Sequence, residues 1–519
     1  MQKFFSSWKQ DLPASLVVFL VALPLCLGVG LASTNVEEVT GMPNIFSGLI
    51  SGIIGGIVVG ALSGSPLGVS GPAAGLITII TGALVTLGSF EGFLLAVVLS
   101  GIIQIISGYI GAGVLSRYFP SSVIKGMLAA IGITLILKEI PHAVGYDKDF
   151  FGDESFWQRD GHNTFSELIY ALEAFSPGAI VISIISLLIL ILFESKYMKK
   201  LVLFKYIPGA LIVVILGVVL NAFFQNSIPG LLIGKEHLVS LPVAENAKEF
   251  VSFLTFPDFN FLSNPDIYVI ALTLALVGSL ETLLSVEATD KLDPDKQHTP
   301  TNRELKAQGV GNLISGLIGG LPITQVIVRS SANINSGGKS KLSTIIHGIL
   351  LLLAVFFIPV LLNKIPLASL AAILLMIGYK LTKLSLFQSM YRLGFEQFLP
   401  FIATIIGVLL TDLLIGIGIG IVFSIFYILR KNFRNNYKYS HSEHSGQNIH
   451  TIKLSEEVTF LNKASIFELL NNIEANSKVI IEGSHCEEID YDALEIIKEF
   501  RDYRAKEKNI ELEITGLKI

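Results

Sequence analysis

Long runs of apolar residues, separated by short polar segments, occupy the chain from residue 14 to residue 430. A helix that crosses a bilayer needs about 20 mostly apolar residues. The pattern predicts fourteen spans, at residues 14–33, 45–63, 71–87, 91–110, 121–140, 177–194, 204–224, 265–289, 306–321, 323–336, 342–363, 366–384, 397–412 and 413–430. We therefore expect an all-α polytopic membrane domain over residues 12–430, after a short N-terminal segment at residues 1–11.

Lys and Arg are concentrated in alternate loops, and this bias sets the orientation of membrane proteins. The intervening loops carry acidic residues instead: Glu37, Glu38, Asp147, Asp149, Asp153 and Glu154. With fourteen spans all the basic loops fall on one side of the membrane, whereas thirteen spans would break this agreement. Both termini are therefore predicted to be cytoplasmic, in a plasma membrane of the bacterial inner-membrane type.

The composition narrows the class of protein further. Apolar residues make up 51% of the chain and charged residues only 15%, against about 25% charged residues in soluble proteins. Charge is concentrated in the tail, where 24 of the last 71 residues are charged. A soluble enzyme, a secreted disulfide scaffold and a disordered protein are excluded. The net charge of −5 gives no argument for nucleic acid as a partner.

Two of the predicted spans are interrupted by Gly and Pro. The first interruption lies at 63–75 and the second at 319–324, in the third span of each half of seven. Paired breaks at corresponding positions indicate the binding site of an inverted-repeat transporter. Helices that start at the midplane would direct free N–H groups at an anion, from Ala73 and Ala74 in one half and Thr324 and Gln325 in the other. The alternative is that Gly and Pro are simply common in membrane helices.

Charged residues inside the predicted spans are candidates for function, because a charge in the membrane is costly. Arg329 follows the second break and is predicted to hold an anion or to replace a co-bound cation. Glu281 and Ser285 share one helix face, since they are four residues apart. Glu281 could carry a coupling proton, help to hold Na⁺, or serve only as a structural partner of Arg329. His347 is expected to be packed, and Asp412 to be a turn residue at the outer surface.

Three stretches resemble the SulP (sulfate permease) family. They are the first span with Ala22–Gly28, the first break with Gly68–Ala74, and the region from Asn302 to Ser340. The resemblance implies a fourteen-span, seven-plus-seven inverted repeat of the uracil-permease type, in which a core domain moves against a gate domain. It also implies an anion site between the third spans of the two halves.

The resemblance extends to individual residues of that site. Arg329 matches the site arginine of the family, and Glu281 and Ser285 match its eighth-span acidic and hydroxyl positions. Val326 and Val328 stand where prestin-like members have serines, which leaves fewer hydroxyl donors and puts the substrate in doubt. Arg and Glu together favour proton coupling or exchange.

The polar tail is predicted to be a separate α/β unit at residues 449–519, joined by a linker at 431–448. Strands are expected at 479–481 and 510–514, and a helix at 492–506. The unit resembles a short STAS domain. Asp492 stands where some relatives of that fold carry a phosphoserine, and we expect it to cap the following helix.

These observations predict a secondary active transporter of a small inorganic anion. Sulfate and bicarbonate are the first candidates, with chloride or a dicarboxylate as others. The expected partners are the anion, the lipid bilayer and, from the family, a second copy in a homodimer; no nucleic acid and no cofactor are expected, apart from H⁺ or Na⁺ as a coupling ion. The chain is not expected to be an enzyme or to bind a metal. Two alternatives are a nucleobase permease on the same fold, which Arg329 disfavours, and a membrane sensor or scaffold that signals through the tail.

Overall fold

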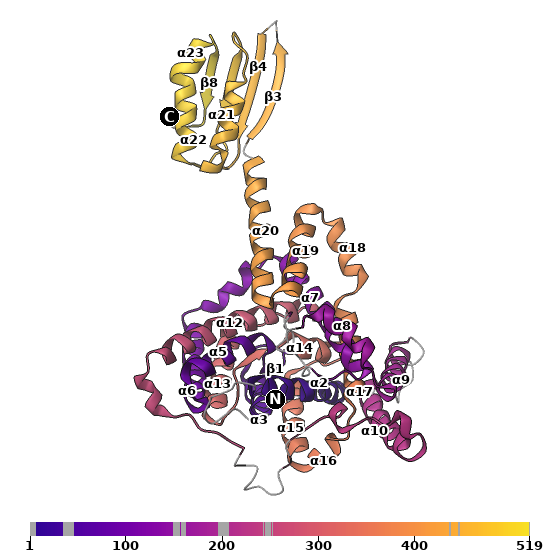
Figure 1. Cartoon of the computed structure of the whole chain (residues 1–519). Coiled ribbons are helices and arrows are strands. Elements are labelled where there is room, and N and C mark those ends of the chain that lie inside the picture. The colour runs from indigo at the N-terminus through magenta and orange to yellow at the C-terminus, as the bar shows by residue number, and fades with distance from the viewer. Residues whose placement is uncertain are drawn as a thin grey trace. The chain divides into compact units, whose positions relative to one another are not determined.

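The computed structural model describes residues 7–34, 46–148, 156, 162–195, 207–241, 243, 251, 253–434, 437–444 and 447–517. The chain divides into two compact units, Met1–Ile421 and Val422–Ile519. Within the described ranges, seven helices are long and apolar enough to cross a membrane by length and composition alone. The other predicted spans are shorter, interrupted or more polar. Figure 1 traces the order of the elements.

The first half of the membrane unit follows the predicted spans closely. Its second span contains one π-helical turn, and its third begins as a short strand. Its elements are α2 (Trp8–Thr34), α3 (Phe46–Ile54), η1 (Gly55–Val59), α4 (Gly60–Leu62), β1 (Ser70–Pro72), η2 (Ala74–Leu76), α5 (Ile77–Leu87), α6 (Phe90–Tyr109), η3 (Ala112–Tyr118), α7 (Ser121–Val144), α8 (Thr164–Glu173), α9 (Pro177–Glu194) and α10 (Gly209–Ser227).

The second half repeats this plan, with a short strand again at the start of its third span. Its elements are η6 (Pro229–Leu231), η7 (Lys235–His237), η8 (Phe259–Ser263), α12 (Asp266–Leu292), α13 (Thr301–Leu317), β2 (Ile323–Gln325), α14 (Ile327–Asn335), α15 (Lys341–Phe357), α16 (Pro359–Leu362), α17 (Leu367–Leu381), α18 (Leu384–Arg392), α19 (Phe395–Leu410) and α20 (Leu413–Arg434). The predicted fourteen-span inverted repeat is thereby confirmed.

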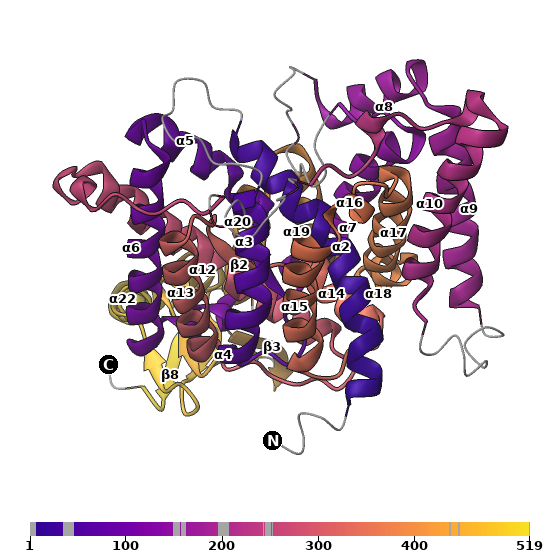
Figure 2. The same ribbon diagram turned by 90° about the horizontal axis from the view of Figure 1, so that it is seen from below.

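The spans pack into two groups within the membrane unit. In the first, α6 lies against α12 and α13, and α2 lies against α3, α14 and α15; in the second, α7 lies against α17 and α19, and α9 against α10 and α17. Figure 2 shows α6 and α13 on one side of the unit and α9, α10 and α17 on the other. The helix α5 packs on α2, α6 and α12, and the start of α20 packs on α19 through Gly416. We call the first group, with α5, the core domain, and the second group, with the start of α20, the gate domain.

Glycines allow the central helices of each group to approach closely. A Cβ on Gly101 of α6 would lie 2.6 Å from the carbonyl oxygen of Gly309 on α13. In the gate domain, a Cβ on Gly132 of α7 would lie 2.7 Å from the carbonyl oxygen of Gly378 on α17. Small residues are common where helices cross in lipid. The hydrophobic effect does not drive helices together there, so close packing of their backbones has to hold them.

The second unit is the predicted α/β unit. Its sheet has the order β3 (Tyr437–His444), β4 (Gln447–Leu454), β6 (Lys478–Glu482) and β8 (Glu511–Thr515), with β3 antiparallel and the others parallel. The helical elements that pack on it are η9 (Phe460–Asn462), α21 (Lys463–Asn471), α22 (Tyr491–Glu499), η10 (Phe500–Arg504) and α23 (Ala505–Glu507), and β5 (Glu457–Val458) pairs with β7 (Glu488–Ile489). The predicted strands at 479–481 and 510–514 and the helix at 492–506 are confirmed.

Two expectations about the tail were wrong. Residues 431–434 continue α20 and 437–444 form β3, although the whole stretch 431–448 was expected to be a linker. An edge strand that faces water carries polar residues, so its composition resembles that of a linker. In addition, Asp490 rather than Asp492 caps α22, because the Asp490 Oδ1 accepts the Asp492 N–H at 2.9 Å. Asp492 instead pairs with Lys463, at 3.6 Å.

Candidate functional site

The two breaks meet in the middle of the core domain as a short antiparallel ladder. Ser70 pairs with Gln325, Gly71 with Thr324 and Pro72 with Ile323. The Val326 N–H extends the ladder by donating to the Val69 carbonyl at 2.9 Å. The sequence predicted two breaks at corresponding positions but not that they would pair. The pairing satisfies backbone groups that could not remain unbonded inside a membrane.

Amide side chains on α13 hold this ladder in place. Asn312 accepts the Ile323 N–H at 2.6 Å and donates to the Ile323 carbonyl at 3.0 Å and to Gln104 Oε1 on α6 at 2.7 Å. Gln308, one turn earlier, donates to Ser70 Oγ at 2.7 Å. One polar stripe on α13 therefore fixes both strands. The four-residue spacing of Gln308 and Asn312 within a membrane span is the sequence signal that would have identified it.

Glu304 extends the same stripe toward the end of α4. It is fully buried, and its carboxylate accepts hydrogen bonds from Ser63 Oγ, from the Gly64 N–H at 3.2 Å and from Gln308 Nε2 at 3.0 Å. Lys341 Nζ donates to the Ser63 carbonyl. These contacts position the segment that leads into β1. Glu304 is thus a structural residue of the site.

Arg329 lies in the first turn of α14 and is 1% exposed. Its Nε and Nη1 have no hydrogen-bond partner among the residues that the structure describes. A Cβ on Gly71 would lie 2.0 Å from Nη1, so the guanidinium rests against the backbone of β1. The side chains of Cys26 on α2 and His347 on α15 lie close enough to interact with its charge. Unpaired donors on a buried cation are costly unless a ligand satisfies them.

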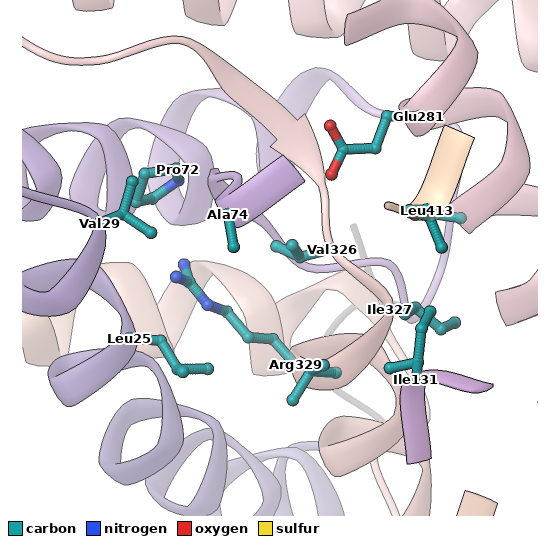
Figure 3. A pocket seen from close by; sticks show the side chains of 12 residues that line it. Leu25, Val29, Pro72, Ala74, Ile131, Glu281, Val326, Ile327, Arg329 and Leu413 are labelled. Carbon is teal, nitrogen blue, oxygen red and sulfur yellow. The ribbon is translucent and has the colours of Figure 1, made fainter. Parts of the chain in front are cut away.

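A small cavity of about 30 Å³ lies beside this guanidinium, at the boundary of the core and gate domains. It is lined by Leu25, Val29, Pro72, Ala74, Ile131, Glu281, Ser285, Val326, Ile327, Val328, Arg329 and Leu413. Figure 3 shows Arg329 reaching toward Pro72 and Ala74 from one side and the Glu281 carboxylate on the other. Because a water molecule needs about 10–15 Å³ by the same measure, the cavity suits a ligand of few atoms.

Two helix starts border the cavity. The first N–H groups of a helix have no acceptor within it, and the first-turn residues Ile327, Val328 and Arg329 of α14 all line the cavity. Neither Val326, which precedes α14, nor Ala73, which precedes η2, forms a side-chain cap. The partial positive charge of both helix starts therefore adds to that of Arg329.

Glu281 and Ser285 are presented by α12 on the opposite wall. Both are buried and line the cavity, as their four-residue spacing on one helix face allows. A Cβ on Gly75 would lie 3.3 Å from Glu281 Oε1, so the carboxylate faces the start of the η2–α5 helix.

The structure brings four of the predicted site residues to the cavity and places three others behind it. Arg329, Glu281, Ser285 and Ala74 line it, and Ala73 is buried next to Ala74. Thr324 and Gln325 are fully buried in β2 and do not line the cavity. Gln325 Nε2 instead donates to Thr289 Oγ1 on α12 at 3.1 Å, which ties the strand to that helix.

A second, separate polar cluster stands at the end of α7. Asp147 accepts hydrogen bonds from Nδ1 of His142 at 2.5 Å and from Nδ1 of His237 on η7 at 2.6 Å. This hydrogen bond raises the pKa of His237 above its ordinary value of 6.5. Burial alone would raise the pKa of Asp147, but the hydrogen bonds from both histidines outweigh it and lower that pKa. The sequence indicated Asp147 only as a loop acid and gave no signal for the two histidines.

The fold and the site together define a class of protein. Inverted repeats that place paired broken helices around a buried cation are an architecture of membrane transporters. The chain belongs to the sulfate permease family, whose family model matches residues 8–404. The family consists of anion transporters and not of enzymes, as the sequence predicts.

Individual relatives agree with this assignment. A candidate sulfate transporter of Bacillus subtilis (strain 168), YvdB, is 28% identical over 83% of this chain and 74% of its own length. The bicarbonate transporter BicA of Picosynechococcus sp. (strain ATCC 27264 / PCC 7002 / PR-6) is 25% identical over 80% of this chain and 69% of its own. The inward-facing structure of the murine anion transporter Slc26a9 has a TM-score of 0.67 at 14% identity, and covers 99% of this chain and 86% of that one.

Proposed function

We propose that this chain is a secondary active transporter of a small inorganic anion, with sulfate and bicarbonate as first candidates. The observation that carries the proposal is the cavity at the boundary of the core and gate domains. There the unpaired donors of Arg329 and the first turn of α14 face one small space. The relatives named for sulfate and bicarbonate support the substrate class.

In this mechanism the core domain carries the anion past the gate domain. Arg329 and the N–H groups at the start of α14 hold the anion, and Ser285 supplies a hydroxyl donor from α12. The gate domain contributes only the apolar side chains of Ile131 and Leu413 to the cavity wall. Weak apolar contacts on that side leave the loaded core free to move.

Glu281 is the proposed coupling residue. Its carboxylate lines the same cavity as Arg329, so a proton or Na⁺ bound there would change the charge that the anion meets. Either ion, or exchange for a second anion, fits this role. The chain is further proposed to lie in the inner membrane with both termini in the cytoplasm, to form a homodimer, and to use its tail as a STAS-like domain.

Uptake into proteoliposomes tests the proposal. Labelled sulfate, bicarbonate and chloride are offered to the full chain under separately imposed proton and Na⁺ gradients. We expect uptake of at least one anion by the wild type. Arg329→Ala should lower it by about tenfold or more, since a charged hydrogen bond contributes about 1.5–3 kcal/mol. Arg329→Lys keeps the charge but not the planar fork, and should retain intermediate activity.

Two further measurements test the coupling role of Glu281 and the proposed dimer. Glu281→Gln should abolish the effect of the driving gradient while anion exchange persists. Monodisperse elution of each variant in size-exclusion chromatography controls for folding, and its light-scattering mass reports the dimer. If well-folded wild type takes up none of the anions under either gradient, the transporter proposal fails and the sensor alternative takes its place.

A further inference from the structure

A second cavity adjoins the first and contains an acidic residue that the proposed transport site does not use. It measures about 60 Å³ and is lined by Ala74, Gly75, Thr78, Ile131, Thr134, Val408, Asp412 and Leu413. Ala74, Ile131 and Leu413 line both cavities, so the two spaces are neighbours. Of these lining residues, all of them described, Asp412 is the only one with an ionisable side chain.

Asp412 lies in the turn between α19 and α20, as expected, and its residue is exposed. The turn lies beside the middle of α7, because Ile131 and Thr134 of that helix line the same cavity. Asp412 Oδ1 accepts the Ile415 N–H at 2.8 Å and so caps α20. The Asp412 carboxylate therefore stands in the open part of the cavity wall.

Asp412 changes the balance of charge that an anion meets. Around the first cavity, Arg329 contributes one positive charge and the two helix starts roughly half a charge each, while the Glu281 carboxylate subtracts one. Without Asp412 this sum is about one positive charge, which leaves the second negative charge of a divalent anion without a counter-charge. Asp412 adds a further negative charge on the gate side, with no lysine, arginine or histidine among the residues that line its cavity.

We propose that Asp412 is a specificity-determining residue that favours monovalent over divalent anions. The inference rests on the proposed function, and it narrows the substrate class to singly charged anions such as bicarbonate or chloride. Repulsion from one fixed charge scales with the charge of the ligand. A neutral residue in place of Asp412 should therefore raise the apparent affinity for both kinds of anion. If it does so by a given factor for a monovalent anion, the factor for a divalent anion should be the square of that value.

The test is a comparison of wild type with Asp412→Asn in proteoliposomes at pH 7.5. The amide oxygen of Asn can still accept the Ile415 N–H, so the variant removes the charge and keeps the cap. Asp412→Ser also offers an acceptor and serves as the second neutral variant if the first folds poorly, and Asp412→Glu is the charge-conserving control. Uptake of the transported anion is measured against increasing chloride, bicarbonate and sulfate as competitors.

We expect sulfate to compete at least tenfold more weakly than the monovalent anions in the wild type. Both neutral variants should lower the half-inhibiting concentration by about threefold for monovalent anions and by about tenfold for sulfate. A wild type that prefers sulfate, or neutral variants that shift all competitors by the same factor, would overturn the role of Asp412 and leave the transporter proposal intact. Absence of any uptake by the wild type would overturn the transporter proposal and with it this inference.

Discussion

Gly71 is required at the site because its side chain is only a hydrogen atom. The residue pairs with Thr324 in the ladder, and the Arg329 guanidinium lies against it. A methyl group at this position would occupy the space of Nη1, 2.0 Å away. The guanidinium would have to move away from its position beside the cavity and the start of α14.

Gly71→Ala should therefore lower anion uptake by about tenfold or more, because a misplaced charged donor loses most of its contribution. The matched control is Gly82→Ala on α5, where a Cβ meets no atom within 4 Å. Initial uptake rates and thermal unfolding midpoints are measured for both variants. Equal uptake by the two would show that Arg329 tolerates displacement and does not bind the anion as proposed.

The sequence identified the charged residues of the site more easily than its backbone. Arg329 and Glu281 stand out because charges within membrane spans are rare. Thr324 and Gln325 were expected at a helix start, but they lie in a strand whose partner is more than 250 residues away in the chain. The side chains that such a strand turns toward the cavity depend on its register with the partner strand. The local sequence does not specify that register.

Among the elements, α7 and η7 are joined by one shared carboxylate. Asp147 accepts from His142 at the end of α7 and from His237 on η7. Runs of apolar residues, and the Gly and Pro residues that interrupt them, were sufficient to place nearly every span in the sequence. They could not reveal this contact, because it joins polar loop residues about 90 positions apart.

This contact should make stability depend on pH. The raised pKa of His237 means that its stabilising contribution is complete below about pH 6.5 and is lost as pH rises through the raised value. The wild type should lose about 1 kcal/mol relative to His237→Gln across that rise, because the glutamine amide donates without titrating. Thermal unfolding in detergent between pH 6 and pH 10 measures the difference. A constant difference between the two proteins over this range would contradict the prediction.

At the scale of the membrane unit, two groups of helices meet across small and largely apolar cavities. The second cavity is bordered by Thr78 from the core domain and by Thr134 and Val408 from the gate domain. The walls of both cavities are mainly apolar, which suits relative motion of the two groups.

A crosslink across the boundary should arrest transport. Thr78→Cys with Val408→Cys joins core to gate, and a short bifunctional thiol reagent should reduce uptake to near the level of empty liposomes until it is cleaved by reductant. Thr134→Cys with Val408→Cys joins two helices of the gate domain around the same cavity and should leave uptake unchanged. The Cys486→Ser background removes the partly exposed native thiol. Full uptake by the crosslinked core–gate pair would exclude movement between the two groups.

The three-residue ladder between β1 and β2 has a consequence for energy conversion. Because it fastens the two half-sites together, the ladder would carry the binding geometry unchanged if the core moves as proposed. A rigid site would give its ligand the same intrinsic affinity on both faces of the membrane. Net direction would then be set, as in any secondary transporter, by the gradients across the membrane, and the same molecule would run in reverse whenever those gradients invert.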